Sequence, residues 1–306
     1  MQSILDYGVE GKESEEDFQR TENAIKEAIL FAKDNDAVDI VCSKFTGLIP
    51  FSILEKLHAN ETLTSKENEI YQAAKDRIYS ISKLAFENNV SLFVDAEESW
   101  IQQPLDDLTF ELMREFNKEK PIIYNTVQLY RKDRLQFLKD TVEKAKQAGF
   151  IYAAKLVRGA YMEKEEVRAK QLGYENPIQT SKENTDKDYD EALRFAIGNI
   201  EQVAVCVATH NEKSTLLATQ LMHQKKLPNN HPHVHFSQLL GMSDHISFNI
   251  AKENYNSSKY MPYGPVKDVI PYLIRRAQEN TSVAGQMGRE LKLLKDEVRR
   301  RKLFVW

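Results

Sequence analysis

Glycine, cysteine and long apolar runs are all scarce in this sequence, and each scarcity excludes a class of protein. The chain has only 11 glycines in 306 residues, and no G-x-G-x-x-G motif follows a strand-like run, so a Rossmann dinucleotide cradle has no support. Its two cysteines form no C-x-x-C pair, which removes a thiol-based metal or redox site. No apolar run approaches the ~18 residues of a membrane-spanning helix, and the first residues do not read as a signal peptide.

What the sequence does contain is typical of a soluble globular protein with a sizeable core. Hydrophobic residues make up 42% and charged residues 29% of the chain. The net charge of −4 gives no general electrostatic basis for binding nucleic acid. Cys42 and Cys206 lie within apolar runs, so we expect buried, reduced thiols and a reducing compartment such as the cytoplasm.

Short β-rich runs alternate with longer segments of helical periodicity, which is the pattern of a parallel sheet with crossover helices. Eight such runs are present, the number that closes a (β/α)8 barrel. An open doubly wound sheet would give a similar alternation. The expected strands lie within 3–9, 38–45, 90–97, 121–128, 150–157, 202–209, 233–240 and 258–263.

Helical segments lie between these runs and show one apolar face each. Phe18, Ile25 and Ile29 share such a face, as do Leu138 and Val142 further along the chain. A glycine at 149 stands where a glycine commonly ends a helix, directly before the run at 150–157.

In a barrel of this kind, catalytic groups gather at the carboxyl ends of the strands. Polar or ring-bearing residues recur at those ends in this sequence. They are Lys44, Asp95, Glu97, Gln128, Lys155, Thr209, His210, Gln238, Tyr260 and Tyr263.

The sharpest local feature is the group Tyr272, Arg275, Arg276 and Glu279, which share one helix face at i, i+3, i+4 and i+7. Two guanidinium groups beside an aromatic ring suit a small carboxylate, because arginine offers a bidentate fork. An exposed stripe of arginine and glutamate is the alternative, and spacing alone favours it.

A second feature is the segment from Lys155 to Tyr161 at a strand end. Gly159 and Ala160 permit close approach of a flat ligand to the backbone, and the neighbouring cations suit a negatively charged cofactor. A tight turn with a solvated arginine explains the same pattern, and as an isolated motif it is weak.

Metal sites have less support. Asp95 and Glu97 would point the same way along a strand, but no other acidic residue recurs at neighbouring strand ends. His233 and His235 would share a strand face without a convincing third ligand, so ordinary polar histidines are favoured. We therefore expect no metal. Near His210, either Thr209 or Asn211 would cap the following helix.

Taken together, KLVRGAYMEKEEVRA, VATHN, YMPYG and YLIRRAQENT resemble the FAD-dependent proline dehydrogenase family over most of the chain. The resemblance implies a distorted (β/α)8 barrel whose last helix lies over the barrel top. We expect that barrel to span residues 1–282, followed by a basic helical tail at 283–306. The tail would be a solvated helix or an amphipathic helix for a membrane or a partner.

The resemblance also implies the site. FAD would accept a hydride from C5 of L-proline, giving Δ1-pyrroline-5-carboxylate, and a quinone would take the electrons at a peripheral membrane contact. The expected catalytic residues are Lys44, Asp95 and Lys155. The substrate would meet Lys44, Leu239, Tyr260, Tyr272, Arg275 and Arg276. FAD would meet Gln128, Lys155, Val157, Gly159, Ala160, Tyr161, Thr209, His210, Gln238 and Glu279.

Three alternatives remain open from the sequence. One is a metal-dependent barrel lyase or aldolase that uses Asp95, Glu97 and Lys155. The second is a barrel that binds an amino acid without catalysis, and the third is a dehydrogenase that prefers hydroxyproline. The sequence leaves the oligomeric state undetermined.

Overall fold

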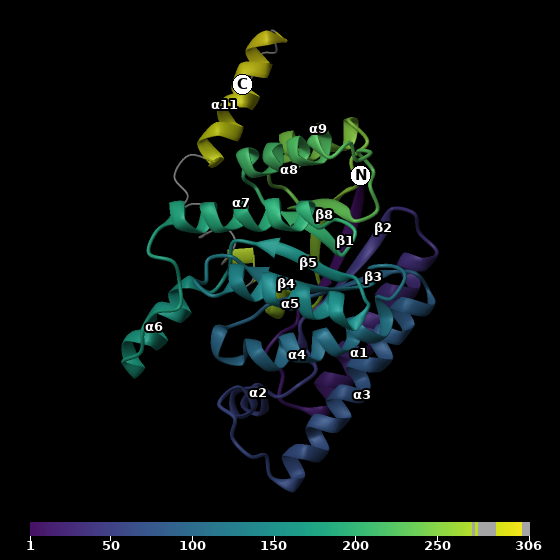
Figure 1. Ribbon diagram of the computed structural model, residues 1–306, viewed down its shortest axis with the longest axis vertical. Coiled ribbons are helices and arrows are strands. Elements are labelled where there is room, and N and C mark those ends of the chain that lie inside the picture. The colour runs from purple at the N-terminus through teal and green to yellow at the C-terminus, as the bar shows by residue number, and fades with distance from the viewer. Residues whose placement is uncertain (271–272, 275–285, 302–306) are drawn as a thin grey trace. The chain divides into compact units, whose positions relative to one another are not determined.

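Eight parallel strands form a closed barrel in chain order, β1 to β8, in the computed structural model, with helices packed around it (Figure 1). The structure describes residues 1–270, 273–274 and 286–301. Each expected strand is present, and the closed order excludes the open doubly wound sheet. The strands are β1 (Gln2–Tyr7), β2 (Val38–Ser43), β3 (Ser91–Val94), β4 (Ile123–Gln128), β5 (Tyr152–Val157), β6 (Val203–Ala208), β7 (Val234–Leu239) and β8 (Ser257–Tyr263).

The connections between the strands are helical, as the alternation predicts, but two of them hold a pair of helices. One pair joins β2 to β3 and the other joins β5 to β6. Among the described residues the helices are α1 (Glu15–Lys33), the 3-10 turn η1 (Phe45–Gly47), α2 (Phe51–His58), α3 (Ser65–Glu87), α4 (Ser99–Phe116), α5 (Arg134–Ala148), α6 (Met162–Leu172), α7 (Lys182–Gly198), α8 (Glu212–Gln224), α9 (Asp244–Lys252) and α11 (Gln286–Arg300).

Local sequence fixes several helix ends. Thr64 and Glu67 form a reciprocal capping box at the start of α3, which satisfies two backbone N–H groups that have no partner within the helix. The glycine at 149 ends α5 with φ of 76°, a left-handed conformation that glycine adopts without steric cost. That helix end was predicted from the sequence and is confirmed.

The core is continuous between the barrel wall and the helices. Every residue of β4 is buried, as expected for a parallel strand that is covered on both faces. Phe18, Ile25 and Ile29 of α1 are at most 2% exposed, so the predicted helix face is the packed one. Cys42 and Cys206 are buried free thiols, as the apolar runs indicated.

The strand register places polar side chains inside the barrel. Cys42 on β2 lies opposite both Asp6 on β1 and Phe93 on β3. On the other side of the barrel, Lys155 lies between Thr126 and Cys206. Because side chains alternate across a strand, residues paired in this way share one face. The interior layer near the carboxyl ends is therefore polar and partly charged.

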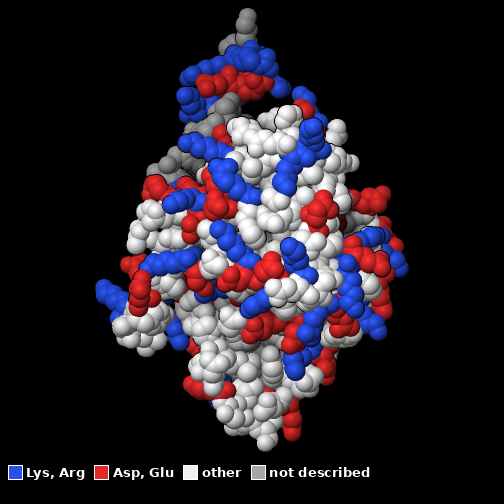
Figure 2. Space-filling view, in the orientation of Figure 1, with Lys and Arg blue, Asp and Glu red and all other residues white. Residues whose placement is uncertain are grey.

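Residues 1–263 and 264–306 form two compact units, and each is described by itself. In the second unit, residues 266–270 and 273–274 are helical, and α11 follows. The boundary at 282 and the helix over the barrel top stay predictions. Among the described residues, no helix is both long and apolar enough to cross a membrane. On the face of the first unit in Figure 2, acidic and basic side chains are intermingled.

Candidate active site

Two lysines and two aspartates meet inside the barrel, near the carboxyl ends of the strands. The ammonium group of Lys44, just after β2, donates to both carboxylate oxygens of Asp6 at 2.8 and 2.9 Å. It also lies 3.5 Å from Oδ2 of Asp95. Lys155 on β5 donates to Oδ1 of Asp95, and the Tyr260 hydroxyl donates to Oδ2 at 2.8 Å. Four predicted site residues, Lys44, Asp95, Lys155 and Tyr260, are therefore in one cluster.

The cluster is buried and its formal charges sum to zero. Lys44 is 3% exposed, Lys155 5% and Asp6 0%. Burial opposes ionisation of Asp95, but the neighbouring Lys155 and Lys44 lower the pKa of its carboxyl overall. Burial also opposes the charged form of Lys155, which by itself would lower the pKa of the lysine. The negative charge of Asp95 outweighs that effect and raises the pKa of Lys155. Burial raises the pKa of Asp6, with Lys44 acting against that rise. Asp95 thus keeps the Lys155 ammonium group protonated inside the barrel.

Cys42 is the neutral member of this cluster. Its thiol lies 3.1 Å from Oδ1 of Asp95 and 3.5 Å from the Tyr260 hydroxyl. Burial, with the negative charge of Asp95, raises the pKa of the Cys42 thiol. Asp6, Cys42 and Asp95 bring three possible metal-ligand atoms within 4.8 Å of one another. Both carboxylates already bind lysine ammonium groups, so the geometry favours an internal ion-pair network over a cation site.

Glu97 does not join Asp95, although both were expected to point the same way along a strand. β3 ends at Val94, so the backbone is free to turn before Glu97. The Glu97 carboxyl accepts from the backbone N–H of Thr46 at 3.1 Å and also contacts the Thr46 hydroxyl. Burial, reinforced by the charge of Glu98, raises the pKa of Glu97 to about 8. The pair of carboxylates that a metal-dependent lyase would use is therefore not formed.

The loop after β5 lies close to the Tyr130 ring at Gly159. Gly159 has φ of 144°, and a Cβ atom there would lie 2.3 Å from the ring of Tyr130. The next residue, Ala160, donates its N–H to Oε1 of Gln128 at 3.3 Å. Gln128 in turn donates to the backbone carbonyl of Glu97 at 2.9 Å. Gln128 and Ala160, two of the residues that were expected to bind the cofactor, thus contact each other beside Gly159.

Arg158 links the ends of β5 and β6 to two helices, a role that the sequence did not reveal. Its guanidinium group donates to Asp186 on α7 and to Thr209 at 2.6 Å each, and to Ser214 on α8 at 3.0 Å. It also stacks over the ring of Tyr189. Thr209, predicted to bind the cofactor, is therefore fixed in place. Asn211, not Thr209, caps α8.

The remaining predicted residues of the first unit lie around the same barrel end. His210 shares a hydrogen bond of 2.9 Å with Ser243, at the start of α9. Gln238 is buried and donates to the backbone carbonyl of Thr209 at 3.2 Å. Val157 and Leu239 are the last residues of β5 and β7. Tyr161 is buried, and that burial raises the pKa of its hydroxyl.

Four of the predicted site residues belong to the part of the chain that the structure does not describe. Tyr272, Arg275, Arg276 and Glu279 lie outside the described residues. Sequence reasoning missed Asp6 and placed Cys42 only in the core. A polar residue inside an apolar run, as Asp6 is within SILDYGV, is the signal that could have identified it.

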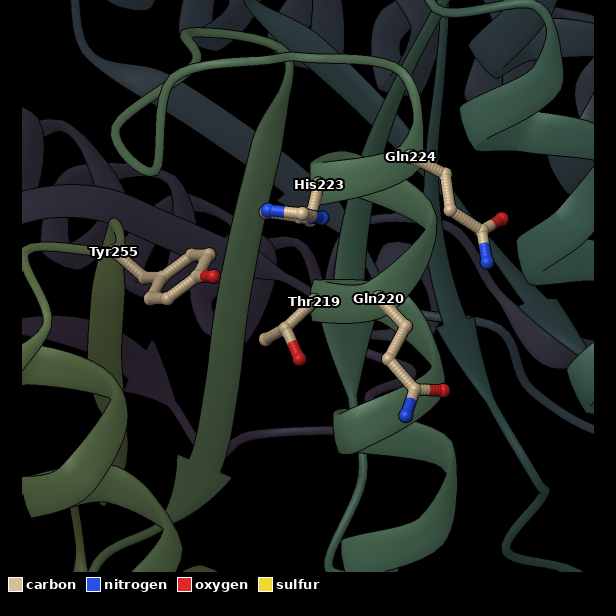
Figure 3. Close-up of a pocket in the computed structure, with 5 residues that line it drawn as sticks. All are labelled: Thr219, Gln220, His223, Gln224 and Tyr255. Carbon is tan, nitrogen blue, oxygen red and sulfur yellow. The ribbon is translucent and has the colours of Figure 1, made fainter.

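One open surface hollow lies away from this cluster (Figure 3). His223 near the end of α8 and Tyr255 before β8 face each other across it. Thr219, Gln220 and Gln224 complete its lining. These elements precede β7 and β8, so the hollow is at the amino end of the barrel, opposite the ion-pair cluster. Its lining carries no carboxylate or ammonium group.

Comparison with known proteins identifies relatives of this chain. A family model described as Proline dehydrogenase matches residues 1–289. Proline dehydrogenase 1, mitochondrial, of Dictyostelium discoideum is 35% identical over 343 aligned positions, covering 98% of this chain and 60% of that protein. The human protein of that name is 42% identical over 228 positions, covering 74% of this chain and 38% of that protein. Hydroxyproline dehydrogenase of Xenopus laevis is 38% identical over 262 positions, 83% of this chain and 56% of that protein.

The chain thus spans 60% or less of the length of these three relatives. Among solved structures, proline utilization A (PutA) from Bdellovibrio bacteriovorus, inactivated by N-propargylglycine, matches with a TM-score of 0.81. The match is 24% identical and covers 93% of this chain and 30% of that protein. At that identity the likeness concerns the fold, and it agrees with the eight-stranded barrel described above.

Proposed function

The chain belongs to the proline dehydrogenase family, and on that basis we propose that it is an FAD-dependent oxidoreductase that converts L-proline to Δ1-pyrroline-5-carboxylate. The observation that carries the proposal is the buried network of Lys44, Asp95, Lys155 and Tyr260 near the carboxyl ends of the strands. In (β/α)8 enzymes that end of the barrel is where substrates meet catalytic groups.

The residues after β4 and β5 fit a flat cofactor. Gly159 packs directly against the Tyr130 ring, where a larger residue would clash, and the side-chain oxygen of Gln128 accepts from the backbone N–H of Ala160. Lys155 would place a fixed positive charge near the ring system, with Asp95 holding that lysine in position. Thr209 and His210 would contact the cofactor from the end of β6. When bound, FAD supplies the acceptor for the hydride that leaves C5 of proline.

Lys44 would bind the carboxylate of proline, and Tyr260 and Leu239 would contact its ring. Lys44 donates to Asp6 and lies 3.5 Å from Asp95, and these two contacts limit its motion inside the barrel. Arg275 and Arg276 would complete the carboxylate site, with Tyr272 against the ring. Fixing the carboxylate in this way orients C5, and such orientation is worth several kcal/mol of the barrier.

Anaerobic titration of the purified protein with L-proline is the direct test. We expect a bound flavin whose visible absorbance bleaches with L-proline and stays unchanged with D-proline. Arg275→Met and Arg276→Met should each raise KM, because each removes a charged hydrogen bond worth about 1.5–3 kcal/mol. Arg299→Met, which alters a residue whose side chain is 80% exposed, is the matched control. A protein that binds no flavin, or a flavin that L-proline leaves oxidised, would refute the proposal.

Hydroxyproline is a second candidate substrate, because one relative is named a hydroxyproline dehydrogenase. The ratio of kcat/KM for L-proline and trans-4-hydroxy-L-proline decides between them. A hydroxyl group on the ring would lie near Leu239 and Tyr260 in the proposed pose. We expect L-proline to be preferred, because the Tyr260 hydroxyl already donates to Asp95.

We also propose a quinone as the electron acceptor, with a peripheral membrane contact during that step. Two relatives carry the word mitochondrial in their names, whereas a cytoplasmic location stays our prediction for this chain. Reoxidation of the reduced flavin by a short-chain quinone, compared with reoxidation by oxygen in the same stopped-flow experiment, tests the acceptor. Equal rates with both would contradict it.

A further inference from the structure

A buried lysine on β8 binds the turn between β7 and α9, residues 240–243. Lys259 is 4% exposed, and because its neighbour Tyr260 points into the barrel, its own side chain points outward, toward the helices. Its ammonium group donates to the backbone carbonyl of Met242 at 2.7 Å and lies 2.8 Å from Oδ1 of Asp244. The carbonyl of Leu239 is a longer contact, at 3.5 Å. An ammonium group has three N–H donors, and the turn with its two flanking residues offers an acceptor for each.

One residue of this turn has a conformation that needs support. Ser243 has φ of 52° and ψ of 40°, the left-handed region that residues other than glycine seldom adopt. Such a conformation persists where the surrounding structure fixes the backbone. Lys259 contributes to this, because its ammonium group contacts Met242 before Ser243 and Asp244 after it. An apolar residue at position 259 would fill the space without holding either neighbour.

The turn is joined to the corner that follows β6, where the proposed cofactor site begins. Oγ of Ser243 shares a hydrogen bond of 2.9 Å with Nδ1 of His210. A second contact joins the same two segments, because Nε2 of His245 on α9 lies 2.7 Å from a carboxylate oxygen of Glu212 at the start of α8. Figure 1 shows these two helices side by side. The position of His210 therefore depends on the β7–α9 turn as well as on β6.

We propose that Lys259 is a positioning residue for the cofactor site, and that it acts through Ser243 on His210. His210 is among the residues expected to contact FAD, so this role rests on the proposed function. The contacts run from the ammonium group, through the turn, to the imidazole ring. Thr209 is held separately, because Gln238 donates to its carbonyl at 3.2 Å. Loss of the lysine should therefore weaken FAD binding without abolishing it.

FAD release from the purified holoenzyme measures this effect. Lys259→Met keeps most of the side-chain length and removes the three donors. The fluorescence of FAD released on dilution should show a Kd about tenfold higher than for the unaltered chain. At saturating FAD, KM for L-proline should not change, because Leu239 stays paired with Tyr260 in the barrel. A loss of stability alone would lower the melting temperature and leave the FAD Kd of the folded protein unchanged.

Two further variants test the route through the turn. Ser243→Ala should also raise the FAD Kd, and the double variant with Lys259→Met should be no worse than the weaker-binding single variant, because the two residues act in series. Asp244→Asn removes the charge that faces the ammonium group and leaves Lys259 in place. It should raise the Kd by a smaller factor, and it provides the test if Lys259→Met does not fold.

Hydrogen exchange of the backbone amides is a readout that needs no flavin. Lys259→Met should speed exchange over residues 240–247 and 210–215, and it should leave α2 unchanged. Lys26→Met is the matched control, because it removes a lysine that lies 2.6 Å from Glu22 on α1, outside this turn. The control should alter neither the FAD Kd nor exchange over residues 240–247.

The possible failures are distinguishable. An unaltered chain that binds no flavin would overturn the proposed function and, with it, the role of Lys259. An unaltered chain whose flavin bleaches with L-proline, beside a Lys259→Met variant that binds FAD equally tightly, would overturn the role of Lys259 alone. Unchanged exchange over residues 240–247 in that variant would overturn it as well. Additive effects of Lys259→Met and Ser243→Ala on the FAD Kd would have the same consequence.

Discussion

Replacing Asp95 by asparagine should destabilise the fold strongly, because it leaves a buried lysine without its counterion. Lys155 is 5% exposed, and Asp95 is the carboxylate that its ammonium group contacts. Lys44 keeps Asp6 at 2.8 Å in the variant, so the loss falls on Lys155. Breaking a buried ion pair by removing one partner costs about 3–5 kcal/mol. In urea unfolding, with a slope of a few kcal/mol per molar, the midpoint should fall by roughly 1–2 M.

A double-mutant cycle tests the reasoning behind that number. Asp95→Asn/Lys155→Met removes both charges, so it should be less destabilised than the sum of the two single variants by about 0.5–3 kcal/mol. Glu16→Gln is the control, because its pair with Arg20 is at the surface, with the Glu16 side chain 85% exposed and the Arg20 side chain 56% exposed. That change should cost ~0–1 kcal/mol. Simple additivity of the two single changes, or a loss for Asp95→Asn no larger than for the control, would refute the ion-pair account.

Three further predictions follow from the same site. Gly159→Ala should lower the flavin content per chain and the melting temperature, because its Cβ would lie 2.3 Å from the Tyr130 ring and the φ of 144° suits glycine; full occupancy by absorbance would contradict this. The pKa of Glu97 is raised to about 8 in the folded chain from an ordinary 4.5. Between these two pH values the folded chain keeps a proton on Glu97 that the unfolded chain has lost. Unfolding free energy should therefore fall as pH rises from about 5 to 8, by up to ~1.4 kcal/mol per unit, and denaturant titrations should show a flatter profile for Glu97→Gln. Lys44→Met should raise KM for proline about tenfold to a hundredfold, since the charged hydrogen bond it removes is worth about 1.5–3 kcal/mol; steady-state kinetics with an unchanged KM would remove Lys44 from the substrate site.

The barrel was predictable from the sequence because each of its strands is a local signal. A parallel strand covered on both faces favours apolar and β-branched residues, and short β-rich runs marked the positions of the eight strands. The glycine at 149 was predictable for a similar reason, since a left-handed helix end has a strong residue preference. The paired helices between β2 and β3 were not marked in this way, because periodicity shows that helix is present without showing where one helix stops.

The site was only partly predictable, because its key contacts join residues that are distant in the chain. Lys44, Asp95 and Lys155 could be chosen because each lies at or near a strand end. Their shared contacts with Asp6 and Cys42 depend on the register around the closed barrel, which the sequence does not display. Glu97 was assigned to the wrong neighbour for a related reason. The alternation of side chains holds only while the strand continues, and β3 stops at Val94.

The balance of charge in the cluster bears on how an anionic substrate would be held. Asp6 and Asp95 already compensate Lys44 and Lys155, so the four groups together offer no net positive charge to a carboxylate. A substrate that binds Lys44 must share that lysine with Asp6, and a second source of positive charge then becomes necessary. The paired guanidinium groups of Arg275 and Arg276 are the candidates that the sequence supplies. The internal network would thus set the position of the lysines, and the arginines would provide most of the attraction for the carboxylate.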